Sequence, residues 1–363
     1  MNNKYKICIH IARSNSFIGT INNVPFAGAP AGVFDEVKFT KQKITITANR
    51  SKKFRIEDIL KKKGNSLSGQ ILKSIVFLYL KNGERIRITK ITVDRSTTRT
   101  QDPTFEYDVD KYMQPLADDF TLRFAIPDPI IDFIWREGKN FANLRSILTH
   151  FLCGLSSPDR YYIFERLWRT FEQLCLFHNR ADRENSDFKA LAAMRTYIVG
   201  HIGDFPEALN EANKVSALAF RKFDWEGYVM NEFPVLADGA SRKLYENKFK
   251  VFFVTNNRDL RVVKMLEDIV PLRTAEMTHF GISADVNGHI TSCLALRERH
   301  DENVLTMICC KYAYYLRNKM FHGEIPDFSF TFAQGTDDDQ RLDKINSLLE
   351  LLCYELLLKF DRL

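Results

Sequence analysis

The stretch Arg317-Asn318-Lys319-Met320-Phe321-His322-Gly323 closes a long apolar run that begins near Asn303. Apolar residues recur through this run at helical spacing, at Leu305, Ile308, Cys309, Tyr312, Leu316 and Met320. Gly323 suits the end of a helix, and Pro326 follows shortly after it. The pattern therefore predicts an amphipathic helix over residues 303–322 with a polar cluster in its last turn.

The polar cluster consists of Arg317, Asn318 and His322. Asn318 and His322 are four residues apart and share a helix face, whereas Arg317 is offset from His322 by about 140° on an ideal helix. Arginine offers a planar fork of donors for phosphate, histidine exchanges protons near neutral pH, and asparagine can orient either group. The set suits phosphodiester cleavage without a metal. The alternative is an ordinary helix end, because the helix dipole favours basic side chains at a C-terminus.

The pattern Arg-Asn-x-x-x-His-Gly at the end of a hydrophobic helix resembles the signature of the HEPN superfamily. Many members of that family are metal-independent ribonucleases of toxin and antiviral systems. The resemblance extends more weakly to residues 159–177, which look like a family core helix, and to residues 343–361, which look like the closing helix. It covers at best residues 140–363.

The resemblance implies roles for the three polar residues. His322 would move the proton, Arg317 would neutralise charge on the phosphoryl oxygens, and Asn318 would position one of them. No cofactor is implied. A single helix end presents few groups, so we expect a homodimer in which two copies of the stretch complete one active site.

Other residues are candidates for contact with RNA. Lys319 belongs to the same stretch, and Tyr314 or Tyr315 could stack a base, with packing inside the bundle as the alternative role. Residues 1–127 hold 22 Lys and Arg against 12 Asp and Glu. This excess predicts nucleic-acid contact at Lys52, Lys53, Arg55, Lys61, Lys62 and Lys63. The alternative is that these lysines decorate a solvated sheet surface.

Composition sets broad limits on the protein. Its 363 residues are enough for two domains. The N-terminal residues show no secretory signal, and no stretch approaches a membrane-spanning length free of charges. The seven cysteines lack paired spacing, which argues against a disulfide framework and fits a reducing cytoplasm. We therefore expect a cytoplasmic protein that is not bound to a membrane.

Residues 1–127 are expected to form a small β-rich domain, a barrel or a sandwich. Alternating polar and apolar residues predict strands at 6–12, 43–48 and 84–93. The continuous apolar run at 74–80 is interpreted as a buried strand, joined to the next by a hairpin at Asn82-Gly83. A short helix is expected at 56–63.

The boundary is placed at Ile126-Pro127-Asp128-Pro129, where strand patterns stop. Helical periodicity dominates residues 128–363, so the predicted fold class is α+β with a larger, HEPN-like helical bundle. Helices are expected at 130–135, 144–152, 159–177, 186–202, 207–220, 259–269, 303–322 and 343–360. Within this part, residues 249–255 are interpreted as a strand, and Asp337-Asp338-Asp339 as an exposed loop.

Several other groups of polar residues resemble known catalytic or metal-binding sites. Asp128, Glu137 and Lys139 match the residue types of a metal-dependent nuclease motif, but the residues between Asp128 and Glu137 are predicted to form a helix, whereas the motif needs a strand. Acidic residues between Asp102 and Asp110 could gather round a metal, with a solvated turn as the simpler explanation. His178 and His201 each follow a helical run and are expected to be helix-end residues. Zinc-type cysteine pairs and a Walker-type phosphate loop are absent from the sequence.

The function expected from these observations is a metal-independent RNA endonuclease that cleaves through attack of the ribose 2′-hydroxyl. The resemblance implies a toxin or an abortive-infection effector of antiviral defence. The N-terminal domain would then sense a trigger, guide RNA, or restrain the nuclease, with an activating or inhibitory protein partner as one route. The alternative is a non-catalytic module that binds RNA, a nucleotide or a partner protein.

Overall fold

The computed structural model describes residues 3–12, 16–62, 64–84, 86–109, 121–178, 187–233, 242–254, 257–324 and 335–360. Contacts divide the chain into two compact units, Met1–Asp159 with Leu357–Leu363, and Arg160–Leu356. The boundary expected at residue 127 lies inside the first of these units. The reason is that the first helices after that point pack on a helix of the β-rich part.

The first unit is built on an antiparallel sheet with the strand order β2-β3-β4-β1-β5-β6. The strands are β1 (Asn3–Ile11), β2 (Gly19–Val24), β3 (Asp35–Thr40), β4 (Lys43–Arg50), β5 (Ile88–Ser96) and β6 (Phe105–Tyr107). In β1, Tyr5, Ile7 and Ile9 are buried while Lys4 and Lys6 are exposed, as alternation in a half-covered sheet requires. The described strands form one sheet, so the expectation of a barrel or sandwich is wrong.

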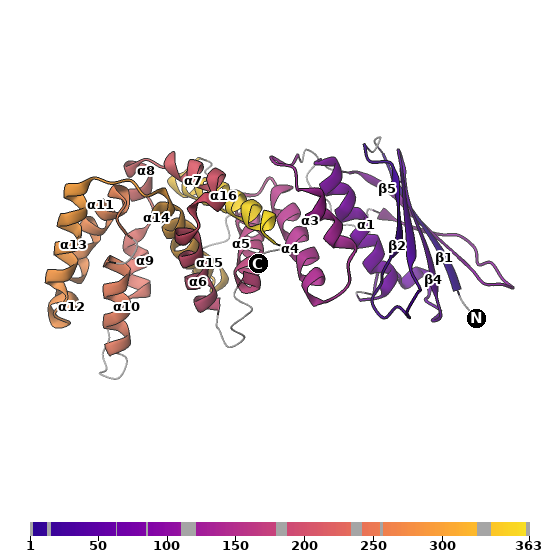
Figure 1. Ribbon diagram of the computed structural model, residues 1–363, viewed down its shortest axis with the longest axis horizontal. Helices are drawn as coiled ribbons and strands as arrows, with labels where there is room; N and C mark the ends of the chain where they lie inside the picture. Colours follow the sequence, from indigo (N-terminus) through magenta and orange to yellow (C-terminus); the bar gives the residue numbers. More distant parts are fainter. Residues whose placement is uncertain are drawn as a thin grey trace. The chain divides into compact units, whose positions relative to one another are not determined.

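Helix α1 (Ser66–Asn82) covers the buried face of this sheet (Figure 1). The strand expected at 74–80 and the hairpin at Asn82-Gly83 are therefore wrong. Helix α1 contacts the sheet on one side and α3 and α4 on the other, so apolar residues occur on both sides of it. The sequence therefore shows an unbroken apolar run instead of the spacing typical of a helix. Gly83 ends the helix with a φ of 67°, and its amide donates to the Tyr79 carbonyl.

The first unit continues with α3 (Asp128–Asp132), the 3₁₀ turn η2 (Phe133–Trp135) and α4 (Lys139–Leu155). The helix expected at 56–63 is a single 3₁₀ turn, η1 (Ile56–Asp58).

A buried polar network joins the sheet to α1. The Arg50 guanidinium donates to both carboxylate oxygens of Asp35 at 2.7 and 2.6 Å, and Gln70 of α1 donates to the same carboxylate. Lys73, one turn further along α1, donates to Glu137. These pairs satisfy charges that would otherwise be costly to bury.

The second unit is helical. Its elements are α5 (Arg160–His178), α6 (Asp187–Gly200), η3 (Ile202–Asp204), α7 (Pro206–Asn213), α8 (Ala217–Arg221), α9 (Trp225–Glu232), α10 (Arg242–Val254), α11 (Leu260–Ile269), η4 (Val270–Arg273), α12 (Thr274–His279), α13 (Ser283–Leu296), α14 (Asp301–Thr306), the π-helical turn η5 (Met307–Tyr312), α15 (Ala313–Phe321) and α16 (Asp337–Leu358). Together with the sheet, these helices confirm the predicted α+β class. No helix in the described ranges is long and apolar enough to span a bilayer.

Two expectations about this unit are wrong. Residues 249–254 belong to α10, because Phe249, Phe252 and Phe253 form one buried helical face, with the Phe249 and Phe253 rings 4.7 Å apart. The acidic triplet begins α16. Thr336 and Asp339 form a reciprocal capping box, each side chain accepting from the other's amide at 3.2 Å.

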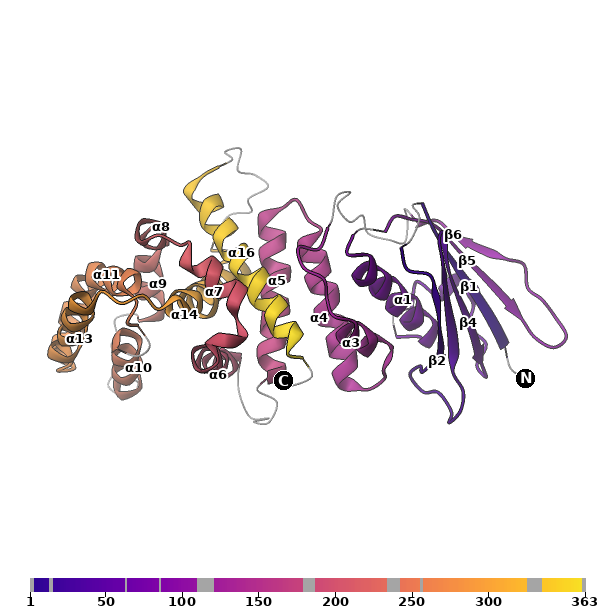
Figure 2. The ribbon, with the colours of Figure 1, turned by 45° about the horizontal axis from the view of Figure 1, so that its top comes forward.

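The elements that carry the candidate site pack around α5. Helix α16 lies beside α5 (Figure 2), and the Asn346 amide group donates to the Arg160 carbonyl at 2.9 Å. The helix expected at 303–322 is present as α14, η5 and α15 in succession. Its π-helical turn is a feature that is often found near functional sites.

Candidate functional site

The last turn of α15 is held by a fully formed C-terminal cap. Gly323 has a φ of 68°, and its amide donates to the Met320 carbonyl at 3.2 Å. The Glu324 amide donates to the Lys319 carbonyl at 3.0 Å. This pair of bonds is a Schellman motif, which needs a residue that tolerates positive φ. His322 is the residue between helix and glycine, so its exposed imidazole starts from a fixed backbone position.

The Arg317 side chain is anchored on three sides. Its Nη1 donates to the Asn318 Oδ1 at 3.0 Å, and its Nη2 lies 3.6 Å from the Glu172 Oε1 of α5. The guanidinium carbon is 4.6 Å from the centre of the Phe321 ring. A guanidinium has five N–H donors, so these contacts orient the group and leave donors for a ligand.

Arg317 and His322 are not joined to each other. Within the described part of the chain, no hydrogen bond or ion pair links their side chains. Arg317 turns toward α5 through Glu172, as the angular offset of the two residues on a helix requires. The Asn318 side chain accepts from Arg317, whereas the Asn318 carbonyl accepts from the His322 amide at 2.9 Å. One copy of the stretch thus presents an anchored cation and a free-standing imidazole.

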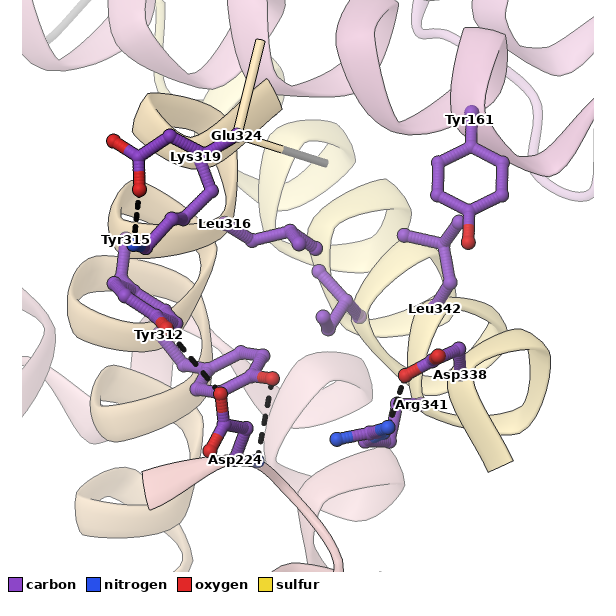
Figure 3. A pocket seen from close by; sticks show the side chains of 11 residues that line it. Tyr161, Asp224, Tyr312, Tyr315, Leu316, Lys319, Glu324, Asp338, Arg341 and Leu342 are labelled. Carbon is purple, nitrogen blue, oxygen red and sulfur yellow. Dashed lines mark hydrogen bonds and ion pairs between the residues drawn. The ribbon is translucent and has the colours of Figure 1, made fainter. Parts of the chain in front are cut away.

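A pocket of about 560 Å³ adjoins the same helix end. The described residues that line it are Tyr161, Asp224, Tyr312, Tyr315, Leu316, Lys319, Glu324, Asp338, Arg341, Leu342 and Ile345. Figure 3 shows α15 on one side and α16 on the other, with Asp224 at one end. Its size is within the range of small-ligand sites.

Asp224 fixes one end of the pocket. Its Oδ1 accepts from the Gly227 amide at 2.9 Å and caps α9, while its Oδ2 accepts from the Tyr315 hydroxyl at 3.2 Å. The Tyr312 hydroxyl accepts from the Asp224 amide at 3.3 Å. Burial, followed by the Asp224 charge, raises the pKa of Tyr315 far above its ordinary value. The phenol therefore stays protonated and keeps donating to this carboxylate.

The two cations of the pocket each have an acidic partner. Lys319 pairs with Glu324, and this pair spans the turn that contains His322. Arg341 pairs with Asp338 in the first turns of α16. With Asp224 added, three acids face two cations among the described lining residues. The pocket is therefore polar at its rim without being basic.

The other predicted RNA contacts belong to both units of the chain. Tyr314 is half-buried, and its ring is 6.1 Å from that of Trp168, a contact that the packing role predicts. In the first unit, Lys62 pairs with Asp58 at 2.9 Å, and Arg55 lies within 4 Å of Glu57 and Asp58, at 3.8 and 3.9 Å. Of the other lysines in this basic segment, Lys52, Lys53 and Lys61 are exposed, and Lys63 lies outside the described residues.

The rejected constellations have structural explanations. Asp128 pairs with Lys81 and Glu137 with Lys73. The described residues contain no cluster of three His, Cys, Asp or Glu side chains able to hold a metal. The rings of His178 and His201 each lie 4.4 Å from that of Tyr197, as helix-end residues that pack on a neighbour.

Sequence reasoning missed three residues of this region. Glu172 was recognisable only as a polar residue on the outer face of its helix, because its partner Arg317 is far along the chain. Asp224 and Arg341 carry no motif that marks them. Asp224 precedes a helix start, which predicts a cap and nothing more.

Comparison with protein-family models, with curated proteins and with solved structures finds no match to this chain. The resemblance of the Arg317–Gly323 stretch therefore stays a prediction from its residues.

Proposed function

We propose that the protein is a metal-independent RNA endonuclease whose active site includes Arg317, Asn318 and His322. The observation that carries this proposal is the capped end of α15. There an anchored guanidinium and an exposed imidazole occupy the same short segment. These groups match the two needs of phosphodiester cleavage, proton transfer and stabilisation of charge on phosphorus.

The proposed reaction is an internal displacement. A base removes the proton from the ribose 2′-hydroxyl, and the 2′-oxygen bonds to the adjacent phosphorus. The bond from phosphorus to the 5′-oxygen breaks, and an acid protonates that oxygen. The products are a 2′,3′-cyclic phosphate and a 5′-hydroxyl end. His322 serves as the acid or the base, Arg317 neutralises the phosphoryl oxygens, and Asn318 positions one of them or orients Arg317.

The site is proposed to be shared by two copies of the chain. The reaction needs groups near both the attacking and the leaving oxygen, and one stretch supplies a single imidazole. A two-fold axis beside α15 would bring two Arg317 and two His322 side chains to one RNA strand. The half-exposed Phe321 ring, 52% accessible, is apolar surface suited to such an interface.

The remaining roles are also proposals. The basic segment of the first unit, with Lys52, Lys53 and Lys61 exposed, would hold the RNA backbone. The proposed setting is the cytoplasm, in antiviral defence by abortive infection or as a toxin. A protein partner that activates or inhibits the nuclease would act there.

Incubation with total RNA in EDTA tests the proposal. Wild-type protein should cut the RNA and leave 2′,3′-cyclic phosphate ends, and Arg317→Ala and His322→Ala should each lower the rate by at least about 100-fold. Matched controls are Arg221→Ala and His279→Ala, which remove the same residue types from the last turns of α8 and α12. A fully 2′-O-methylated RNA should stay intact.

A non-catalytic binding module is the second candidate. It is favoured by the engagement of Arg317 with both Glu172 and Asn318, which is also how a purely structural arginine behaves. Intact RNA with wild-type protein and with both variants would support the module. If both Arg317→Ala and His322→Ala still cut RNA at the wild-type rate, these two residues are not part of the active site.

A further inference from the structure

The pocket between α15 and α16 differs in character from the helix end beside it. Its walls combine the Tyr312 and Tyr315 rings with apolar side chains of Leu316, Leu342 and Ile345, and charged groups lie around them (Figure 3). Flat aromatic and apolar walls with a few placed polar groups are typical of sites for planar ligands.

The charge of the lining decides between two kinds of planar ligand. Free nucleotides carry several negative charges, whereas the described lining residues hold three acids against two cations, each cation already paired. This balance disfavours a triphosphate or diphosphate inside the pocket. It accepts an uncharged base whose phosphate stays outside, as in a polynucleotide.

The carboxylate at the end of the pocket selects among bases. Each oxygen of Asp224 accepts one hydrogen bond, from Gly227 or Tyr315, and each has a second lone-pair site. Asp224 is exposed and can therefore accept from a ligand. Adenine, cytosine and guanine carry an exocyclic amino donor that suits a carboxylate. Uracil has none.

The pocket also borders the proposed cleavage site. Lys319 and Glu324, which line it, lie on either side of His322 in the chain and pair with each other across that turn. A base held in the pocket would leave its ribose and phosphate at the end of α15, beside the imidazole.

We propose that this pocket binds an unpaired, amino-bearing base of single-stranded RNA next to the phosphate at His322. The inference rests on the proposed function for the role of the bound RNA. Asp224 is a specificity-determining residue in this proposal, and Leu316 and Leu342 form the wall on which the base packs. Double-stranded RNA is excluded, because its bases are stacked and cannot enter a pocket.

The test uses the full chain and fluorescent 2′-O-methyl eight-mers of A, C or U, with binding followed by anisotropy in EDTA. Wild-type protein should bind the A and C oligonucleotides about tenfold more tightly than the U oligonucleotide. Leu316→Trp, which fills the pocket, should weaken binding of A and C by about tenfold. Leu218→Trp is the matched control, because Leu218 is 70% exposed on α8 and does not line the pocket.

Asp224→Asn supplies a second variant that keeps the fold. Asparagine keeps one side-chain oxygen that can accept from the Gly227 amide and cap α9. Its amide nitrogen replaces the other oxygen, so the Tyr315 hydroxyl would accept a hydrogen bond there instead of donating one. The preference for A and C over U should therefore shrink or reverse, while circular dichroism and the melting temperature stay close to wild type. Equal binding of all three oligonucleotides by the wild type, or no effect of either substitution, would overturn the inference.

The same measurement separates this inference from the proposed cleavage. Arg317→Ala and His322→Ala should keep the base preference while they lose cleavage. If the wild type cuts no RNA but binds A and C more tightly than U, the result supports the base-binding pocket and contradicts the proposed nuclease. If the wild type cuts RNA but Leu316→Trp and Asp224→Asn leave binding unchanged, the result supports the proposed nuclease and contradicts the proposed base-binding pocket.

Discussion

At the scale of single residues, a buried ion pair of the second unit joins segments that are distant in the sequence. Arg261 of α11 binds both carboxylate oxygens of Asp259, and its Nη1 donates to the carbonyls of Ala212 and Val215 at 3.0 Å. Its side chain is 5% exposed, and that of Asp259 is completely buried. The pair ties the loop after α7 to the starts of α11 and α14.

Arg261→Ala should therefore lower the free energy of unfolding by about 3–5 kcal/mol, because the Asp259 carboxylate would stay buried without a partner. The measurement is the midpoint of urea denaturation followed by circular dichroism. Arg299→Ala is the matched control. Arg299 is 54% exposed, lies 3.8 Å from Asp301 and donates to the Asn213 carbonyl at 2.8 Å. Because these contacts face solvent, its loss should cost less than about 1 kcal/mol.

His300 should give the protein a pH-dependent stability. Burial lowers the pKa of His300, but the hydrogen bonds and charges of Glu298 and Glu302 outweigh it, and the pKa is raised overall. The stabilisation is complete below the unfolded pKa of about 6.5 and is lost as the pH rises through the higher folded pKa. The urea midpoint of wild type should thus fall toward that of His300→Gln as the pH rises from 6 to 8.5. A constant difference would contradict the assignment, as would an NMR titration with an unraised pKa.

At the scale of elements, helix ends explain much of the second unit. Helix α7 begins with Pro206, and Phe205 before it offers no capping side chain. The cap comes instead from α16, where the Glu355 carboxylate accepts from the amides of Glu207 and Ala208 at 2.8 and 3.1 Å. Glu355 is 3% exposed, so the helix dipole and two amides stabilise a buried negative charge.

Glu355→Ala should destabilise the fold by about 1–3 kcal/mol, since the amides of Glu207 and Ala208 lose their acceptor. Glu355→Gln keeps one acceptor and should show a smaller loss. Thermal denaturation measures both, and amide exchange should show the protection of α7 falling first. If Glu355→Gln were as damaging as Glu355→Ala, the negative charge rather than the hydrogen bonds would dominate.

At the scale of the whole molecule, the predicted homodimer has a quantitative signature. With a shared site and free exchange of subunits, adding excess Arg317→Ala/His322→Ala double mutant should lower activity roughly as the square of the wild-type fraction. Independent sites would give a linear fall. Light scattering at the same concentrations should report a dimer, and an active monomer would refute the shared site.

The basic segment of the first unit makes a separate prediction. If Lys52, Lys53 and Lys61 contact the RNA backbone, replacing all three by Glu should weaken RNA binding and flatten its dependence on salt, because fewer counterions are released. The melting temperature should change little, since the three side chains are exposed. Unchanged affinity and salt slope would reduce the segment to ordinary surface charge.

The sequence by itself determined the elements whose signals are local. Alternation of polar and apolar residues predicted β1 and β4, and apolar spacing followed by Gly323 predicted the helix that ends at His322. These signals are readable because strand and helix periods and a glycine stop act within a few residues. The Arg317, Asn318 and His322 cluster was visible for the same reason.

Tertiary structure alone decided the features that depend on partners far along the chain. Residues 74–80 of α1 were predicted as a strand because burial on two sides removes the polar residues that reveal a helical period. Residues 249–254 of α10 were predicted as a strand because the apolar Val251 stands on the exposed face, where it is 49% exposed. Glu172 contacts Arg317, and Asp224 contacts Tyr315. The partners of each pair lie far apart in the sequence, and no local pattern predicts that they meet. The pocket between α15 and α16 exists only once those helices are packed, since packing, and not any single motif, determines which side chains share a cavity.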